Sequence, residues 1–273
     1  MGGFAIIAGM LSVQTLASGS KGNCTYVTSG ETSILVDIGL TLPTMLKRLA
    51  VAGIKPESID AVLVTHEHSD HIGGVAKFCA RFGTKLYVYE GAGQCFLECA
   101  KGMPMELVKT FDEPFMIGDI EVDFFKVPHD SCYCFGYTFS KGEHKFAMAT
   151  DLGSMRDEIY DKMQGSQIVL IESNYDTAKL ALNRKYPEWL KRRIASRTGH
   201  LSNTSAGVAA ARLFSQGTRQ IILAHLSDEN NSPMLARRVV GDFLEKNNIK
   251  MQIEIAHQNE VSQLHRVDIA TKI

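Results

Sequence analysis

The sequence predicts an α/β fold in which two mixed sheets pack face to face, with helices outside them. Three observations predict it: two blocks of strand patterns, helical patterns that follow each block, and 45% hydrophobic residues in a chain of 273. Sheets bury their apolar faces against other layers, and a chain of this length can bury a sizeable core. Because neither a linker-like stretch nor a short repeat divides the chain, we expect residues 1–273 to form one domain.

Apolar and β-branched runs separated by glycines open the first block. They predict strands at residues 11–16, 24–28 and 34–37. Apolar residues at helical spacing then predict helices at 43–51 and 71–82, and short apolar runs predict strands at 61–64 and 86–89.

Strand patterns return in the second block with few helices between them at first. They predict strands at 120–127, 135–139 and 146–149, and then strands at 168–171, 221–224 and 251–255 that alternate with helices at 202–214 and 232–244. Ser202 and Ser232 stand where each of these helices begins, as expected of N-caps.

Charge and hydropathy exclude several classes of protein. With 29 Lys and Arg against 30 Asp and Glu, the net charge of −1 excludes a polybasic protein. The apolar stretch at residues 3–11 is far shorter than the roughly 18 residues of a membrane span and lacks the basic start of a secretory signal. We therefore expect no membrane partner and a cytoplasmic location. Met10 is a second candidate start, which would make residues 1–9 an extension.

The cysteines are expected to be reduced thiols that mostly fill the core. None of the six forms a C-x-x-C pair, so neither a zinc finger nor a redox motif is indicated. A catalytic cysteine would need an electropositive setting that the sequence does not indicate. The six are Cys24, Cys79, Cys95, Cys99, Cys132 and Cys134.

The strongest motif is a histidine–aspartate cluster directly after the predicted strand 61–64. It reads H-x-H-x-D-H and consists of His66, His68, Asp70 and His71. Imidazole and carboxylate ligands suit zinc, manganese or iron. Four such residues within six positions are too many for one open site, so they predict two divalent metal ions that share a loop. The alternative is a chance run of polar loop residues.

With residues 35–39 (Leu-Val-Asp-Ile-Gly) upstream, this motif resembles the metallo-β-lactamase superfamily, an αββα sandwich with a two-metal site at one edge of its sheets. The resemblance implies three further ligands in order, each at the end of a predicted strand: His129, Asp151 and His225. It implies His66, His68 and His129 on one metal, Asp70, His71 and His225 on the other, and Asp151 as a bridge. Taken singly, His129 or His225 could equally be an ordinary histidine. Asp37 is expected to orient a ligand.

A second constellation consists of Glu172, after the strand 168–171, and His200, in Gly-His-Leu-Ser-Asn at 199–203. It resembles the phosphodiesterase branch that includes tRNase Z and the RNase J-like nucleases. That resemblance implies a histidine, held by a glutamate, that protonates the leaving oxygen. Ile171 departs from the branch, which often has histidine before the glutamate. The alternative is that His200 merely flanks a helix.

Two spacings narrow the branch. His129 and Asp151 are 22 positions apart, too close for the tRNA-gripping arm of tRNase Z, and Asp151 and His225 are 74 apart, too close for an inserted β-CASP domain. What remains resembles the compact YycJ/WalJ-type exonuclease family over nearly the whole chain. This resemblance implies 5′→3′ exonuclease action on double-stranded DNA.

A basic segment at residues 179–197 precedes His200. It has seven basic residues against the single acid Glu188, and we expect it to bind phosphates, with Arg192 and Arg193 as candidate contacts. Its aromatic residues, Tyr186 and Trp189, are candidates for stacking on a base. The alternative is a solvated basic helix with an aromatic anchor.

Further phosphate-binding candidates lie in two loops. They are Ser20, Lys21 and Asn23 in a glycine-rich turn, and Ser227 and Asn230 after His225. The first loop could equally be a plain turn, and the second could cap the helix that follows.

The sequence therefore predicts a two-metal phosphodiesterase acting on nucleic acid, with double-stranded DNA and 5′→3′ polarity as the leading expectation. Asp70 and Asp151 would orient a metal-activated hydroxide for attack on phosphorus, and His200, supported by Glu172, would act as the acid. The alternatives are a small-molecule hydrolase of the same fold, for a thioester, lactone or phosphodiester, and a binding module with a degenerate site. The sequence predicts no oligomeric state.

Overall fold

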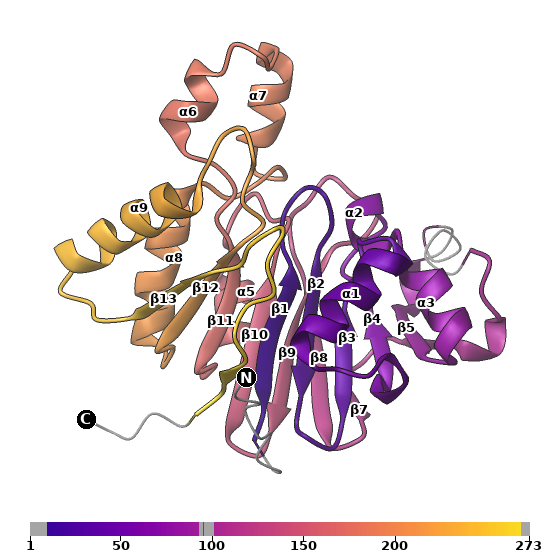
Figure 1. Cartoon of the computed structure of the whole chain (residues 1–273). Coiled ribbons are helices and arrows are strands. Elements are labelled where there is room, and N and C mark those ends of the chain that lie inside the picture. The colour runs from indigo at the N-terminus through magenta and orange to yellow at the C-terminus, as the bar shows by residue number, and fades with distance from the viewer. Residues whose placement is uncertain (1–9, 93–94, 96–100, 269–273) are drawn as a thin grey trace.

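The computed structural model describes residues 10–92, 95 and 101–268. Two seven-stranded sheets face each other, and helices cover their outer faces (Figure 1). The predicted sandwich is confirmed, while the possible extension at 1–9 lies outside the described residues. None of the helices described is both long and apolar enough to cross a membrane.

The first sheet is built from the N-terminal block and one short C-terminal strand. Its order is β14 (His265–Arg266), β1 (Ser12–Ala17), β2 (Cys24–Thr28), β3 (Ser33–Val36), β4 (Ala61–Leu63), β5 (Lys85–Tyr89) and β6 (Val108–Phe111). Pairing is antiparallel from β14 to β3 and parallel from β3 to β6. Its helices are α1 (Leu42–Ala52), α2 (Ser69–Ile72) and α3 (Val75–Phe82), with short 3-10 turns at Pro56–Ser58, Glu90–Ala92 and Met105–Leu107.

The second sheet has the same plan. Its order is β13 (Gln252–Ile255), β12 (Gln220–Ala224), β11 (Ile168–Glu172), β10 (His144–Ala149), β9 (Phe135–Lys141), β8 (Ile120–Lys126) and β7 (Phe115–Ile117). Pairing is antiparallel from β7 to β10 and parallel from β10 to β13. The helices α5 (Asp157–Met163), α8 (Asn203–Ser215) and α9 (Pro233–Lys246) belong to this half.

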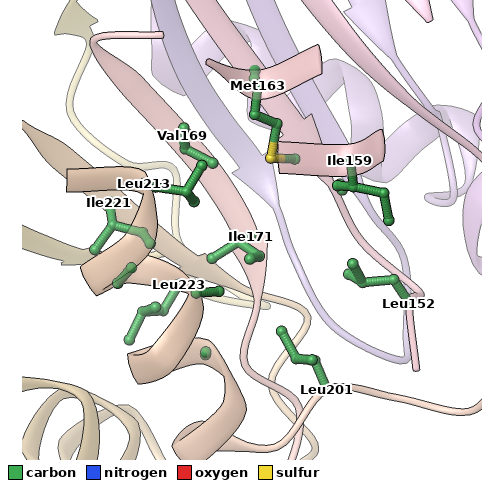
Figure 2. Packing of buried hydrophobic residues seen from close by; sticks show 14 of the residues in the cluster. Leu152, Ile159, Met163, Val169, Ile171, Leu201, Leu213, Ile221 and Leu223 are labelled. Carbon is green, nitrogen blue, oxygen red and sulfur yellow. The ribbon is translucent and has the colours of Figure 1, made fainter. Parts of the chain in front are cut away.

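Strand β11 shows why the central strands read as unbroken apolar runs. Val169 and Ile171 pack toward the helices, in a cluster with Leu201 and Leu213 (Figure 2). The alternate residues, such as Leu170, pack between the two sheets. Successive side chains of a strand point to opposite faces, so a strand with both faces covered needs apolar residues throughout.

The prediction of a single helix at 71–82 is wrong, because the chain forms two helices there. Gly73 and Gly74 separate α2 from α3. The N–H of Gly74 donates to the carbonyl of Ile38 at 2.7 Å, and a Cβ on Gly74 would lie 2.2 Å from the carbonyl oxygen of Leu40. The glycines therefore let the loop after β3 pack against α2, which fixes the place of His71.

The prediction that all cysteines are reduced is also wrong, because Cys95 and Cys132 form a disulfide. They are 37 positions apart, and folding brings their Cα atoms to 6.6 Å. No local spacing motif could have shown this pairing. Cys24, Cys79 and Cys134 are free and buried, as expected, and Cys99 lies outside the described residues.

Two short helices, α6 (Thr177–Leu182) and α7 (Glu188–Ile194), stand away from the sandwich as a projecting arm (Figure 1). We call residues 177–194 the arm. The side chain of Asp176 caps α6 by accepting from the N–H of Lys179 at 2.9 Å. The arm contains most of the predicted basic segment and leads directly into the turn that carries His200.

Candidate metal centre

The predicted ligands come from the carboxyl ends of strands in both sheets. The motif at 66–71 follows β4, His129 follows β8, Asp151 follows β10 and His225 follows β12. Three residues at these strand ends, Asp37, Asp151 and His225, have positive φ values of 62°, 55° and 54°. Few L-residues adopt this conformation, and it tends to persist only where the surrounding structure enforces it.

Three histidines form one group of potential ligands. His66, His68 and His129 can bring one nitrogen each to within 4.8 Å of one another. Their ring centroids lie 4.5 to 5.2 Å apart. The structure thus brings together the three residues that the family resemblance assigns to one metal.

A second group consists of Asp70, His71 and His225, whose ligand atoms also lie within 4.8 Å of one another. Both histidine Nε2 atoms are 3.6 Å from Oδ2 of Asp70. Asp151 lies between the groups: its Oδ2 is 3.2 Å from Nε2 of His71, and it forms a further potential metal-binding group with His66 and His71. The structure therefore brings together the residues that the family resemblance assigns to the second metal, with Asp151 between the two groups.

Buried polar atoms without partners show that this site fits metal ions. Among the described residues, Nε2 of His66, Nε2 of His225 and Oδ2 of Asp151 accept or donate no hydrogen bond, since the 3.2 Å contact of Asp151 with His71 lacks hydrogen-bond geometry. Leaving such atoms unsatisfied costs free energy, and proteins rarely tolerate it away from functional sites. Nitrogen and carboxylate donors facing one point are the ligand set of zinc, manganese or iron.

Asp37 orients the potential ligand His71 through a hydrogen bond. Its Oδ2 accepts hydrogen bonds from Nδ1 of His71 at 2.7 Å and from the hydroxyl of Thr65 at 2.9 Å, and its Oδ1 accepts from the N–H of Thr65 at 2.8 Å. Because Nδ1 of His71 is the donor, its Nε2 is the atom that faces the metal centre.

Glu172 holds a ligand and a candidate acid together. Its Oε1 accepts from Nδ1 of His225 at 2.7 Å and from Nδ1 of His200 at 2.9 Å. Its Oε2 accepts the N–H groups of Leu152 at 3.1 Å and Leu201 at 2.9 Å. This carboxylate is completely buried. Its hydrogen bonds orient the two histidine side chains and anchor the backbone at Leu152 and Leu201.

These contacts shift the pKa values of the site. Burial acts to lower the pKa of His71, but Asp151 and Asp37 outweigh it and raise that pKa to about 10. Burial likewise acts to lower the pKa of His200, and Glu172 reverses the effect and raises it. His66 has no carboxylate strong enough to compensate, so burial lowers its pKa well below the usual value.

A cavity of about 310 Å³ opens onto the two groups. His68, Asp70, His129, Asp151, His200 and His225 form one side of it. Of the predicted substrate contacts, Ser20, Arg193 and Ser227 line this cavity. Tyr186, Leu190 and Ile194 of the arm also line it.

The other four predicted substrate contacts lie off the cavity wall. Asn23 is buried and accepts the N–H of Gly19 at 2.9 Å, while Asn230 is buried and accepts from the side-chain amide of Asn183 at 2.7 Å. Lys21 is exposed and pairs with Asp228. Arg192 is exposed on the outer side of the arm.

Two residues of the site were missed from the sequence. Asp130 lines the cavity and forms an ion pair with Arg193, which ties the arm to the loop that carries His129. Asn174 lines the cavity, and its side-chain amide donates to the carbonyl of His225 at 2.7 Å. Asp130 directly follows the predicted ligand His129, and Asn174 lies two positions after Glu172, which is the only signal that the sequence offers for them.

A sequence profile described as "Beta-lactamase superfamily domain" matches residues 32–226, well over half of the chain. The chain belongs to the beta-lactamase superfamily. Within it, this superfamily member is similar to two curated proteins over most of its length. It is 36% identical over 244 residues to "Exodeoxyribonuclease YycJ" of Bacillus anthracis, covering 86% of this chain and 90% of the relative.

It is 35% identical over 269 residues to "Exodeoxyribonuclease WalJ" of Streptococcus pneumoniae, covering 94% of this chain and 90% of the relative. Among solved structures, the metallo-beta-lactamase fold protein YhfI of Bacillus subtilis superposes with a TM-score of 0.71 at 20% identity, covering 93% of this chain and 99% of that one. These findings confirm the predicted family resemblance and fold class. This superfamily member is a hydrolase, and its fold implies divalent metal cofactors.

Proposed function

We propose that this hydrolase cleaves phosphodiester bonds in nucleic acid, as a 5′→3′ exonuclease of double-stranded DNA. The observation that carries the proposal is the pair formed by Glu172 and His200 beside the ligand groups, because a phosphodiesterase needs a proton donor for its alkoxide leaving group. The names of the YycJ and WalJ relatives support it.

The metal ions belong to the two groups already described. His66, His68 and His129 would hold one ion, Asp70, His71 and His225 the other, and Asp151 would bridge them. Divalent ions bound there polarise a phosphoryl oxygen and lower the pKa of water. Zinc, manganese and iron all suit these donors.

We infer that His200 donates the proton. Its Nδ1 is bonded to Glu172, which leaves Nε2 for the substrate, and its side chain is 23% exposed on the cavity wall. The raised pKa of His200 increases the fraction of its imidazole that is protonated at neutral pH. Asp70 and Asp151, also on that wall, accept hydrogen bonds from the attacking water and orient it.

The arm supports a nucleic-acid substrate, though with less charge than the sequence suggests. Three of its basic side chains are paired with acids: Lys185 with Glu229, Lys191 with Glu188 and Arg193 with Asp130. Within the described part of the chain, Arg184, Arg192 and Arg197 form no ion pair. These guanidinium groups are available to phosphates.

A small-molecule hydrolase is the second candidate, because Leu190 and Ile194 give the cavity an apolar side that an acyl group could fill. That reaction would not require the basic arm. Salt separates the two candidates, since substrate affinity falls steeply with ionic strength only for a polyanion.

The test is degradation of end-labelled double-stranded DNA with added Mn²⁺ at low and high salt, with His68→Ala as the inactive control. We expect stepwise loss from the 5′ end, absent in the variant and suppressed by salt. If neither DNA nor RNA is cleaved, the proposal is wrong and the small-molecule candidate takes its place. A cytoplasmic location remains a prediction that cell fractionation would test.

A further inference from the structure

We propose that Trp189 is a wedge that stacks on the end of a DNA duplex when the terminal nucleotide enters the metal cavity. The inference rests on the proposed nuclease function and adds to it a substrate-contacting residue outside the cavity. It concerns the arm, which the mechanism at the metal centre does not use.

Trp189 lies on α7, the helix that contributes one face to the wall of the cavity. Leu190, Arg193 and Ile194 line the cavity and share one face of the helix. Trp189 is not part of that wall, and at about 100° per residue it lies at the edge of the cavity face. Arg192 lies on the side of α7 that faces away from the cavity.

The side chain of Trp189 is largely exposed. It is the only tryptophan of the chain, and 65% of it is accessible to solvent. Leu182, at the end of α6, is 78% exposed on the same arm. Tryptophan is enriched at binding surfaces, because its indole offers a large apolar face for stacking. Arg184 and Arg192 are also exposed on the arm, and their charge favours a polyanion as the ligand.

The arm is fixed relative to the metal centre. Arg193 pairs with Asp130, and the N–H of His200 donates to the carbonyl of Ile194 at 2.8 Å. Gly199 allows this close approach, because a Cβ there would lie 2.2 Å from the carbonyl oxygen of Arg193. The position of Trp189 is therefore coupled to that of the proposed acid His200.

The potential metal ligands are buried or half-buried on the wall of this cavity of about 310 Å³, so the phosphate that is cleaved has to enter it. A strand can reach the metal centre from a duplex only if its terminal pair opens, which costs the stacking of that pair. An aromatic ring at the rim replaces the lost stacking on the next base pair, as apolar side chains do in proteins that unstack DNA.

The first test is direct, because the fluorescence of the single tryptophan reports only on Trp189. We expect a short blunt DNA duplex to quench it when added to His68→Ala protein, which does not degrade the probe. Anisotropy of a labelled duplex measures binding independently. If the duplex binds without changing the fluorescence, the wedge is wrong; if no duplex binds, the proposed function itself fails.

The second test compares duplexes with paired and with mismatched ends. We expect Trp189→Ala to lower kcat/KM about 5- to 150-fold on the paired end, the range of one base–aromatic stack. The loss should be much smaller on the mismatched end and absent with bis(p-nitrophenyl) phosphate. Trp189→Phe should retain most activity, and Met116→Ala, exposed on the distant β7, should change nothing.

Equal losses on both duplexes and on the small phosphodiester would show that Trp189 only supports the fold. An unchanged kcat/KM on the paired end would show that the indole does not contact DNA. Either result overturns the inference while leaving the nuclease proposal intact.

Discussion

At the residue scale, the site is defined by the contrast between atoms that are fully bonded and atoms that are not. Nδ1 of both His71 and His225 donates to a buried carboxylate, while Nε2 of His225 and Nε2 of His66 have no partner among the described residues. Side chains held from one side and unsatisfied on the other are preorganised for a ligand.

The residues of the site could be named from the sequence, because the motif at 66–71 points to metal ions and the family resemblance implies His129, Asp151 and His225 after predicted strands. What could not be predicted is which nitrogen faces the metal. That depends on Asp37, Thr65 and Glu172, whose contacts form only in the folded chain. Asn174 could not be predicted for the same reason, because its side-chain amide donates a hydrogen bond to a carbonyl 51 positions away.

Removal of metal should destabilise the protein. The unpartnered atoms of His66, Asp151 and His225 would be left buried, and a ligand at 100 times its Kd contributes about 2.7 kcal/mol to the stability of the folded state. We expect chelation to lower Tm by several degrees and added Zn²⁺ or Mn²⁺ to restore it, as measured by calorimetry. An unchanged Tm after complete chelation, verified by metal analysis, would contradict the metal assignment.

His200→Ala and Glu172→Gln should differ in a diagnostic way. Loss of the acid should lower kcat about 10²- to 10⁴-fold and leave metal content unchanged, because no other ligand depends on His200. Glu172→Gln should lower both kcat and metal content, because Glu172 also accepts the hydrogen bond that orients His225. The measurement is kcat alongside metal content for each variant. Loss of metal from His200→Ala would rule out the proposed role of that residue.

At the scale of elements, glycines decide how closely the loops of the site approach. Fully buried strands such as β11 are predictable, because an unbroken apolar run covers both of their faces. The short helices α6 and α7 are not, since fewer than two turns give too little periodicity and their position depends on tertiary contacts. The break between α2 and α3 was missed because helical spacing continues through it.

Gly39→Ala tests this role of glycine. A Cβ on Gly39 would lie 1.6 Å from the carbonyl oxygen of Asp70, so the loop after β3 and the metal-binding motif must separate. We expect a loss of about 3 kcal/mol in unfolding free energy together with reduced metal content. The matched control is Gly53→Ala, where φ is 73° but no atom lies within 4 Å of the added Cβ.

Gly53→Ala should cost only about 1 kcal/mol, for the left-handed backbone, and leave metal binding intact. Denaturant unfolding and metal analysis of both variants provide the comparison. Equal behaviour of the two would show that the close approach at Gly39 does not position the metal-binding motif.

At the scale of the whole molecule, the metal centre requires that the two sheets remain docked. His66, His68, Asp70 and His71 come from the first sheet, and His129, Asp151 and His225 come from the second. The sequence predicts this division from two blocks of strands. It does not predict how the opposite end of the sandwich is closed, because the residues involved are far apart in the chain and form no motif.

Asp119 closes that end. It lies in the turn between β7 and β8 of the second sheet and accepts a hydrogen bond from the hydroxyl of Ser29 at 2.6 Å, in the turn between β2 and β3 of the first. Its N–H donates to the hydroxyl of Thr32 at 3.2 Å, and Lys141 pairs with its carboxylate. Burial acts to raise the pKa of Asp119, but Lys141 and Ser29 outweigh it and lower that pKa to about 2.

This shift predicts how Asp119→Asn depends on pH. The folded pKa of about 2 lies below the ordinary value near 3.9, so the carboxylate stabilises the fold above about pH 4 and loses that contribution as the pH falls toward 2. We expect the variant to be less stable by about 1 kcal/mol at pH 7, a figure kept small because the group is partly exposed. Denaturant unfolding of both proteins should give free energies of unfolding that converge near pH 2.

As a control, Asp123→Asn removes a surface ion pair with Lys162 and should lower the free energy of unfolding less. If the gap between native protein and Asp119→Asn stays constant from pH 7 to pH 2, the ionised carboxylate of Asp119 does not hold the two sheets together.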